Sequence, residues 1–154
     1  MIDLKRILTA TDFSDASQVA LRYAVAFSQA FQAEVLLCHV LEKPDLLAGM
    51  PPVAEGYFPP NLAELQEQHA RVQCEQVLAT AGLSKSRLLL LHGHPAKEIT
   101  QAATREQADL IIIGTHGRRA IAHLLLGSVA EKVVRLAPCP VLTVRPGEHE
   151  FVTP

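Results

Sequence analysis

The sequence predicts an α/β domain built on an open sheet of five parallel strands, with helices on both faces. Short apolar runs such as 110–113 are rich in β-branched residues, which indicates strands buried on both faces. Segments with helical periodicity separate these runs throughout, and this alternation is typical of open α/β sheets. The 154 residues suit one compact domain, expected over 1–146, with a short tail at 147–154.

Five strands and four helices are expected in order along the chain. The first helix follows Ser14 and the second follows Asn61, two good N-cap residues. Gly82 can end the second helix, and Pro95 suits the first turn of the third. The expected strands are 6–10, 34–40, 87–91, 110–113 and 140–144, and the expected helices are about 15–31, 62–81, 96–107 and from 129 onward.

One segment, 41–60, shows no regular pattern and contains five of the ten prolines. About 20 residues without regular structure is long for a compact domain, in which most connections run to roughly 2–6 residues. The segment is interpreted either as a lid over a site or as an ordered surface excursion.

The strongest functional signal is the glycine-rich stretch after the fourth strand. Gly114 and Gly117 follow the strand, and Gly127-Ser128 stands nine residues later, directly before Val129 and a helical apolar pattern. Glycine allows positive φ and close backbone approach to an anion. Ser128 can cap the helix, whose first-turn N–H groups would bind an anion. Ordinary turn glycines are the alternative for the first pair, but both halves together predict a phosphate-binding cradle.

Asp12 ends the first strand, and ligands of open α/β sheets bind at the carboxyl ends of strands near a switch point. If strands one and four are neighbours, Asp12 and the glycine loop face each other across one crevice. Asp12 could instead simply shape the turn before Ser14. The chain has neither a Gly-Lys-Ser/Thr phosphate loop nor a Gly-x-Gly-x-x-Gly fingerprint, which excludes the corresponding nucleotide-binding classes.

Composition excludes several other functions. Fourteen Lys and Arg against sixteen Asp and Glu leave a net charge of −2, without the basic excess of a nucleic-acid-binding domain. No apolar run approaches the ~18 residues that a membrane span needs, and the start lacks a signal-peptide core, so we expect a cytoplasmic protein. Three scattered cysteines, Cys38, Cys74 and Cys139, argue against a disulfide framework. His39, His92 and His94 could approach a zinc ion, but no further ligand is placed to complete the set.

Several motifs together resemble the universal stress protein family. The pattern Gly114-x-x-Gly117, nine residues, Gly127-Ser128 is similar to the family's ATP-binding signature. The resemblance covers nearly the whole chain except 41–60 and the tail, and Ala10 departs from it where many relatives carry proline. The other matching segments are 6–14 (RILTATDFS), 93–95 (GHP), 125–133 (LLGSVAEKV) and 138–144 (PCPVLTV).

The resemblance implies a Rossmann-like fold, with strand order 3-2-1-4-5, that binds an adenine nucleotide. It places the adenine near Thr11 and the backbone of Val40, and Asp12 near the ribose or a phosphate-bound Mg²⁺. On the phosphate side it places a set of residues from the glycine stretch: Gly114, His116, Gly117, Arg118, Gly127, Ser128 and Val129.

The leading hypothesis is therefore a stress-response module switched by ATP, ADP or AMP, without efficient hydrolysis because only Asp12 or a histidine could act as a base. The alternatives are a weak ATPase or self-phosphorylating enzyme, and an interaction module with no nucleotide. The fifth strand would be an apolar sheet edge, so a homodimer through that edge is expected.

Overall fold

The computed structural model describes residues 1–42, 61–83, 86–115, 127–147 and 151–152. Strands and helices alternate along the chain with one helix between successive strands, as the sequence predicts. The strands are β1 (Arg6–Ala10), β2 (Glu34–Leu41), β3 (Ser86–His92), β4 (Leu110–Gly114) and β5 (Val141–Val144). The helices are α1 (Asp15–Phe31), α2 (Leu62–Thr80), α3 (Pro95–Arg105) and α4 (Ser128–Leu136).

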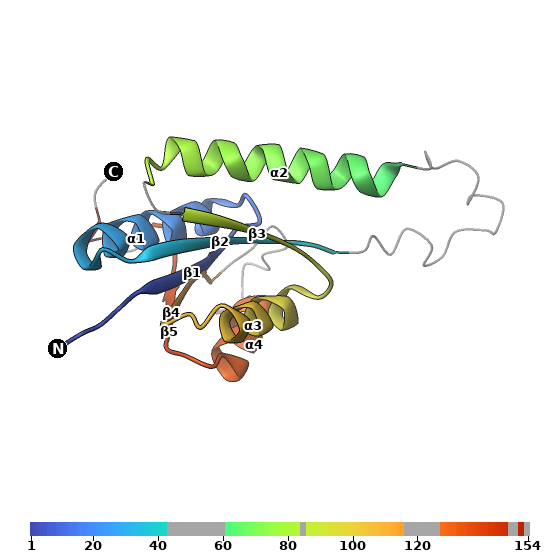
Figure 1. Ribbon diagram of the computed structural model, residues 1–154. Coiled ribbons are helices and arrows are strands. Elements are labelled where there is room, and N and C mark those ends of the chain that lie inside the picture. The colour runs from blue at the N-terminus through green and yellow to red at the C-terminus, as the bar shows by residue number, and fades with distance from the viewer. Residues whose placement is uncertain (43–60, 84–85, 116–126, 148–150, 153–154) are drawn as a thin grey trace.

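The five strands form one parallel sheet in the order β3-β2-β1-β4-β5, which confirms the expected fold class. In Figure 1, α1 and α2 cover one face of the sheet, and α3 and α4 cover the other. The central strand β1 pairs with β2 from Arg6↔Glu34 and with β4 from Ile7↔Leu110. The strand order therefore reverses between β1 and β4, and this position is the switch point of the sheet.

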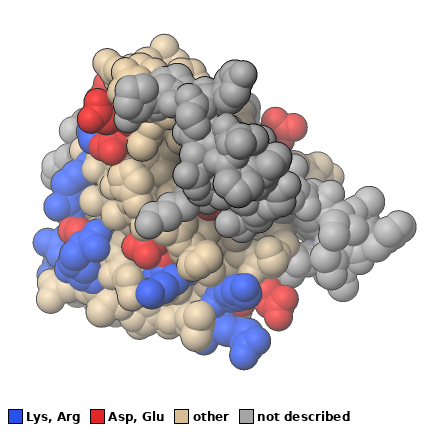
Figure 2. Space-filling model, turned by 90° about the vertical axis from the view of Figure 1, so that its right-hand side faces the viewer, with Lys and Arg blue, Asp and Glu red and all other residues tan. Residues whose placement is uncertain are grey.

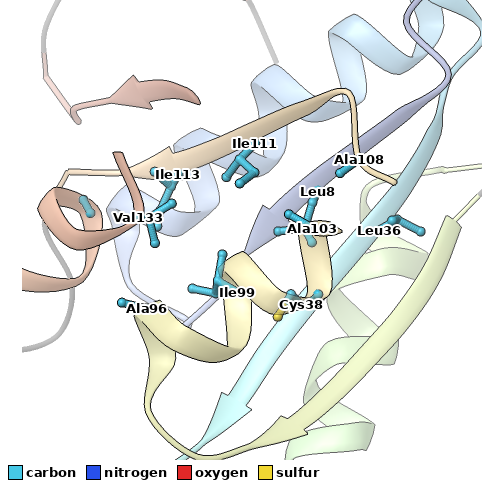
Figure 3. Packing of buried hydrophobic residues seen from close by; sticks show 12 residues of the cluster. Leu8, Leu36, Cys38, Ala96, Ile99, Ala103, Ala108, Ile111, Ile113 and Val133 are labelled. Carbon is cyan, nitrogen blue, oxygen red and sulfur yellow. The ribbon is translucent and has the colours of Figure 1, made fainter. Parts of the chain in front are cut away.

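The core on the α3 and α4 side is formed by branched and small residues that alternate along the strands. Figure 3 shows Leu8, Leu36 and Ile111 of the sheet in one cluster with Ile99 of α3 and Val133 of α4. Ala102 and Ala103 of α3 are also buried in this core. Because alternate strand residues point to opposite faces, Ile7, Val35 and Ile112 pack on the α1 side instead.

Most helix ends agree with the sequence signals. Ser14 caps α1 by accepting a hydrogen bond from Ser17 N, Pro95 occupies the first turn of α3, and Gly82 has φ +64° after α2. Asn61 lies at the N-cap of α2, as expected, but its side chain makes no capping hydrogen bond.

The end of the chain returns to the core beside α1. Phe151 packs edge-on against the Tyr23 ring with centroids 4.9 Å apart, and its backbone N donates to the Tyr23 hydroxyl at 3.4 Å. Val152 packs against the same apolar cluster. Two residues of the expected tail therefore contribute to the packing of the α1 face.

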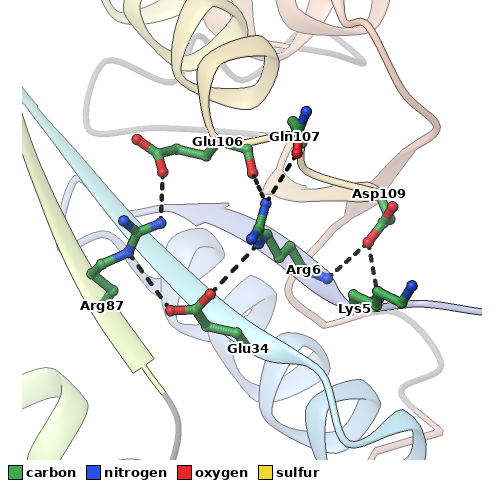
Figure 4. Close-up of polar contacts among 7 residues, drawn as sticks. All are labelled: Lys5, Arg6, Glu34, Arg87, Glu106, Gln107 and Asp109. Carbon is green, nitrogen blue, oxygen red and sulfur yellow. Dashed lines mark hydrogen bonds and ion pairs between the residues drawn. The ribbon is translucent and has the colours of Figure 1, made fainter.

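Charged side chains link four chain segments at the amino ends of the strands (Figure 4). Asp109 Oδ2 accepts from the backbone N of Lys5 and of Arg6 at 2.9 and 2.8 Å. Glu34 lies between Arg6 and Arg87, at 3.8 and 3.6 Å. Arg6 also donates to the carbonyl of Glu106 at 2.9 Å. These contacts hold β1, β2, β3 and the α3–β4 turn in register at the edge opposite the strand ends predicted to bind a ligand.

No helix in the part of the chain that the structure describes is both long enough and apolar enough to cross a membrane.

Thr9 gives a prediction about stability. Its side chain is fully buried, and among the described residues its Oγ1 has no hydrogen-bond partner. Thr9→Val removes this hydroxyl while keeping the side-chain shape, so we expect the free energy of unfolding to rise by about 1 kcal/mol in urea titrations. Thr100→Val is the matched control, because Thr100 Oγ1 lies 3.0 Å from the Ala96 carbonyl, and it should give no gain. A loss of stability in Thr9→Val would contradict this account of the buried hydroxyl.

Glu106 gives a prediction about pH. A hydrogen bond from Arg105 and, after it, one from Arg87 hold the pKa of the Glu106 carboxyl below its ordinary value of 4.5. A carboxyl whose pKa is lower in the folded state stabilises the fold above the unfolded-state pKa and loses that contribution as pH falls. We therefore expect Glu106→Gln to flatten the fall in unfolding free energy below about pH 4.5. Glu75→Gln, at an exposed position on α2, is the control; equal slopes in Glu106→Gln and wild type would contradict the prediction.

Candidate functional site

The candidate site lies at the carboxyl ends of β1 and β4. These strands are paired neighbours, but β1 continues into α1 on one face of the sheet and β4 precedes α4 on the other (Figure 1). Connections that leave adjacent strands toward opposite faces leave a crevice between them, where open α/β sheets bind ligands. The expectation that Asp12 and the end of the fourth strand lie side by side depends on this pairing, which the structure has.

The turn from β1 into α1 is held by its own side chains. Asp12 Oδ1 accepts from Ser14 N at 3.1 Å and from the Ser14 hydroxyl. Thr11 Oγ1 accepts from Phe13 N at 3.0 Å and lies 3.2 Å from Ser17 Oγ. The turn-shaping role considered for Asp12 is therefore present, and the turn carries Thr11 and Asp12 at the edge of the crevice.

Phe13 adopts φ +64°, a left-handed conformation that costs a non-glycine residue roughly 1–3 kcal/mol. Its ring lies 4.7 Å from the ring of His39 on β2. The local sequence does not predict this conformation, because a phenylalanine between Asp and Ser gives no signal for positive φ. Such strain is found where the surrounding structure fixes one backbone geometry.

Gly114 lies where a side chain would not fit. Its φ is not in the left-handed region, so the positive φ that glycine permits is not used at this position. A Cβ on Gly114 would lie 2.7 Å from the backbone carbonyl of Ala16. The missing side chain lets the first turn of α1 pack directly against the end of β4.

The N-cap of α4 is Gly127 and not Ser128. Gly127, with φ −66° and ψ 152°, is the N-cap of α4, and Ser128 is its first helical residue, so the expectation that Ser128 caps the helix is wrong. Gly127 N donates to the carbonyl of Thr115, directly after β4. This bond brings the start of α4 to the end of β4, so the first-turn N–H groups of Ser128 and Val129, which a helix leaves without intrahelical partners, lie at the carboxyl edge.

The backbone N–H and carbonyl of Val40 also lie at the carboxyl edge of the sheet. The Leu41 carbonyl accepts from Gly93 N on the β3 side at 3.1 Å, whereas the Cys38 carbonyl accepts from Thr11 N on the β1 side at 2.8 Å. Because backbone groups alternate sides along a strand, Val40 faces β1, like Cys38. However, β1 ends at Ala10, opposite Cys38, so the Val40 backbone faces the space beyond the end of β1.

Three predicted site residues, His116, Gly117 and Arg118, lie outside the described residues. The described part of the prediction, namely Thr11, Asp12, Val40, Gly114, Gly127, Ser128 and Val129, is gathered at one edge of the sheet. The carboxyl edge therefore offers backbone N–H donors from a helix start and a polar turn, which suits an anion.

The zinc alternative is not supported. His39 Nδ1 donates to the carbonyl of Thr11 at 2.7 Å, and His92 Nε2 lies 3.4 Å from Glu67. Across the described ranges, no three His, Cys, Asp or Glu side chains come together in a group that could hold a metal ion.

The cysteines are free thiols in apolar surroundings. Burial raises the pKa of Cys38 to about 12 and that of Cys74 to about 11, and it also raises the pKa of Cys139. Thiols with such pKa values stay protonated and are poor nucleophiles near neutral pH. The three residues act as small apolar side chains.

Figure 2 shows the face of the molecule toward which β2 runs in Figure 1. Lys and Arg side chains lie mostly in its lower half, the side of α3 and α4, with Asp and Glu among them. Together with the net charge of −2, this mixture leaves no continuous basic surface over the described part of this face.

Comparisons with known proteins agree with this arrangement. Residues 3–145 match the model of the universal stress protein family. A universal stress protein from Thermus aquaticus is 43% identical over 142 residues, which cover 92% of this chain and 98% of the relative. The solved structure of MJ0577, a universal stress protein from Methanocaldococcus jannaschii, aligns with a TM-score of 0.79 at 30% identity and covers 96% of this chain and 100% of that chain.

A more distant structure shares the fold. It is a universal stress protein from Archaeoglobus fulgidus in complex with dAMP, with a TM-score of 0.62 at 21% identity, covering 93% of this chain and 98% of that chain. The family match over most of the chain, the close relative and the sheet order all agree. This chain belongs to the universal stress protein family.

Proposed function

We propose that the protein binds an adenine nucleotide, ATP or its products ADP and AMP, and that occupancy sets its conformation or its choice of partner. The observation that carries the proposal is the bond from Gly127 N to the Thr115 carbonyl, which places the start of α4 beside the end of β4 at the switch point. The N–H groups there can bind phosphate oxygens without a lysine, and the helix dipole favours negative charge at this end.

The other proposed contacts with the nucleotide follow from where each residue lies at the carboxyl edge of the sheet. The adenine would lie against Thr11 and the Val40 backbone, whose outward N–H and carbonyl suit the hydrogen-bonding edge of a purine. Asp12 would lie toward the ribose or toward Mg²⁺ held by the phosphates, and Gly114 and Gly127 to Val129 would hold the phosphate side. His116, Gly117 and Arg118 stay in the proposed site on the family motif alone. The dAMP complex of the Archaeoglobus fulgidus protein supports the proposal, because that protein has the same fold.

Regulated binding is favoured over hydrolysis by the state of Asp12. Its Oδ1 accepts two hydrogen bonds from Ser14, so this carboxylate already holds the β1–α1 turn, and the described residues of the proposed site include no second carboxylate that could act as a general base.

A homodimer through β5 is part of the proposal. The described strands pair β5 with β4 on one side only, and α4 next to it exposes Val134 and Leu136, at 47% and 62% of their surface. An apolar sheet edge is a template for a second chain, and pairing two such edges would cover both.

The nucleotide proposal predicts the effect of Gly127→Val. The backbone of Gly127 has φ −66° and ψ 152°, which any residue adopts, so the fold and the melting midpoint should be preserved. The added side chain would occupy the phosphate position, and we expect ATP affinity in calorimetry to fall by about a hundredfold or more. Ser128→Ala, which removes a hydroxyl but no backbone donor, should weaken binding by only about threefold. Unchanged affinity in Gly127→Val would remove Gly127 from the site.

The dimer proposal predicts the effect of Thr143→Pro. The carbonyls of Pro140 and Val144 accept bonds from β4, so the alternation of the strand turns the Thr143 N–H to the outer edge. Proline at this position removes an N–H donor that faces away from β4 and keeps the hydrogen bonds between β5 and β4. Sedimentation velocity should show a wild-type dimer, a Thr143→Pro monomer and a Thr143→Ser dimer. A monomeric wild type, or a dimeric Thr143→Pro, would contradict pairing through β5.

A further inference from the structure

His39 contacts the turn that borders the proposed site without belonging to that turn. Its Nδ1 lies 2.7 Å from the Thr11 carbonyl, and its ring lies 4.7 Å from the ring of Phe13. A carbonyl oxygen can only accept, so Nδ1 carries the proton and donates. One side chain on β2 thus holds two consecutive parts of the β1–α1 turn, one by a hydrogen bond and one by ring packing.

The bond fixes the direction of a peptide plane. Thr11 N donates to the Cys38 carbonyl on β2, and the Thr11 carbonyl accepts from His39 on the same strand. In a planar trans peptide the carbonyl of one residue and the N–H of the next point in opposite directions. The N–H of Asp12 is therefore directed away from the His39 ring.

The ring contact fixes the next residue. Phe13 has φ +64°, and its N donates to Thr11 Oγ1, so the turn is closed around a backbone conformation that phenylalanine rarely adopts. Packing against the His39 ring stabilises Phe13 in this conformation. Without that ring, the turn could relax to ordinary φ and rotate the Asp12 side chain relative to the crevice.

We propose that His39 is a positioning residue for the nucleotide site, and this inference rests on the proposed function. It would not touch the phosphates. It holds the Thr11–Asp12 peptide and the Phe13 ring so that Thr11 and Asp12 keep the orientation that an adenine nucleotide requires. The inference requires the tautomer with hydrogen on Nδ1 in the nucleotide-free protein.

Two variants at position 39 separate positioning from simple packing. Asn places an amide N–H close to where Nδ1 lies and can still donate to Thr11, whereas Leu fills space and cannot. We expect His39→Leu to weaken ATP binding about tenfold in calorimetry, the loss that one hydrogen bond of ordinary strength produces. His39→Asn should recover affinity to within about threefold of wild type. His92→Leu, at an exposed end of β3 away from the turn, is the control and should bind like wild type.

The nucleotide-free protein supplies an independent readout. Nitrogen-15 spectra of the histidine rings should show hydrogen on Nδ1 of His39, and the amide signal of Asp12 should move in His39→Leu more than in His39→Asn. Hydrogen on Nε2, or equal ATP affinity in His39→Leu and wild type, would overturn the inference. If wild-type protein bound no adenine nucleotide, the proposed function would fail. The tautomer and the Asp12 signal would then decide whether His39 fixes the turn.

Discussion

The pairing of β1 with β4 is the constraint on which the rest of this structure depends. It joins segments far apart in the sequence, through Ile7↔Leu110 to Thr9↔Ile112, and it places the β1–α1 turn beside the end of β4. The close approach is completed by the missing side chain of Gly114, against which the first turn of α1 packs. Any ligand at the switch point must fit between the β1–α1 turn and the end of β4, so the backbone of these two segments limits its shape.

The two edges of the sheet are built differently. At the amino edge, Arg6, Glu34, Arg87 and Asp109 fix the strands to one another with ion pairs and charged hydrogen bonds (Figure 4). At the carboxyl edge, short-range hydrogen bonds shape turns and leave helix-end donors facing outward. This separation lets one edge maintain strand register while the other carries a turn with a strained residue, Phe13.

The architecture could be predicted from the sequence because the strands are mostly apolar and because α1, α3 and α4 have strongly periodic apolar residues. Cap residues such as Ser14 and Pro95 placed most helix starts within one residue. The site could be predicted only in part. The glycine spacing indicated segments that the structure brings to one edge of the sheet. Local sequence could not show the tertiary contact of Gly114 with Ala16, and it misassigned the cap of α4, which is Gly127 and not Ser128. The contact between the left-handed Phe13 and His39 joins the β1–α1 turn to β2, so sequence spacing alone could not show it.

The central claim is that backbone N–H groups at the switch point bind the phosphates of an adenine nucleotide. An amide NMR titration with ATP tests it most directly, because each N–H reports separately. The account predicts that the largest shifts occur at Gly127, Ser128 and Val129, with smaller ones at Thr11, Asp12 and Val40. It is contradicted if saturating ATP leaves these amides unmoved, or shifts amides only at the amino edge around Arg6 and Glu106.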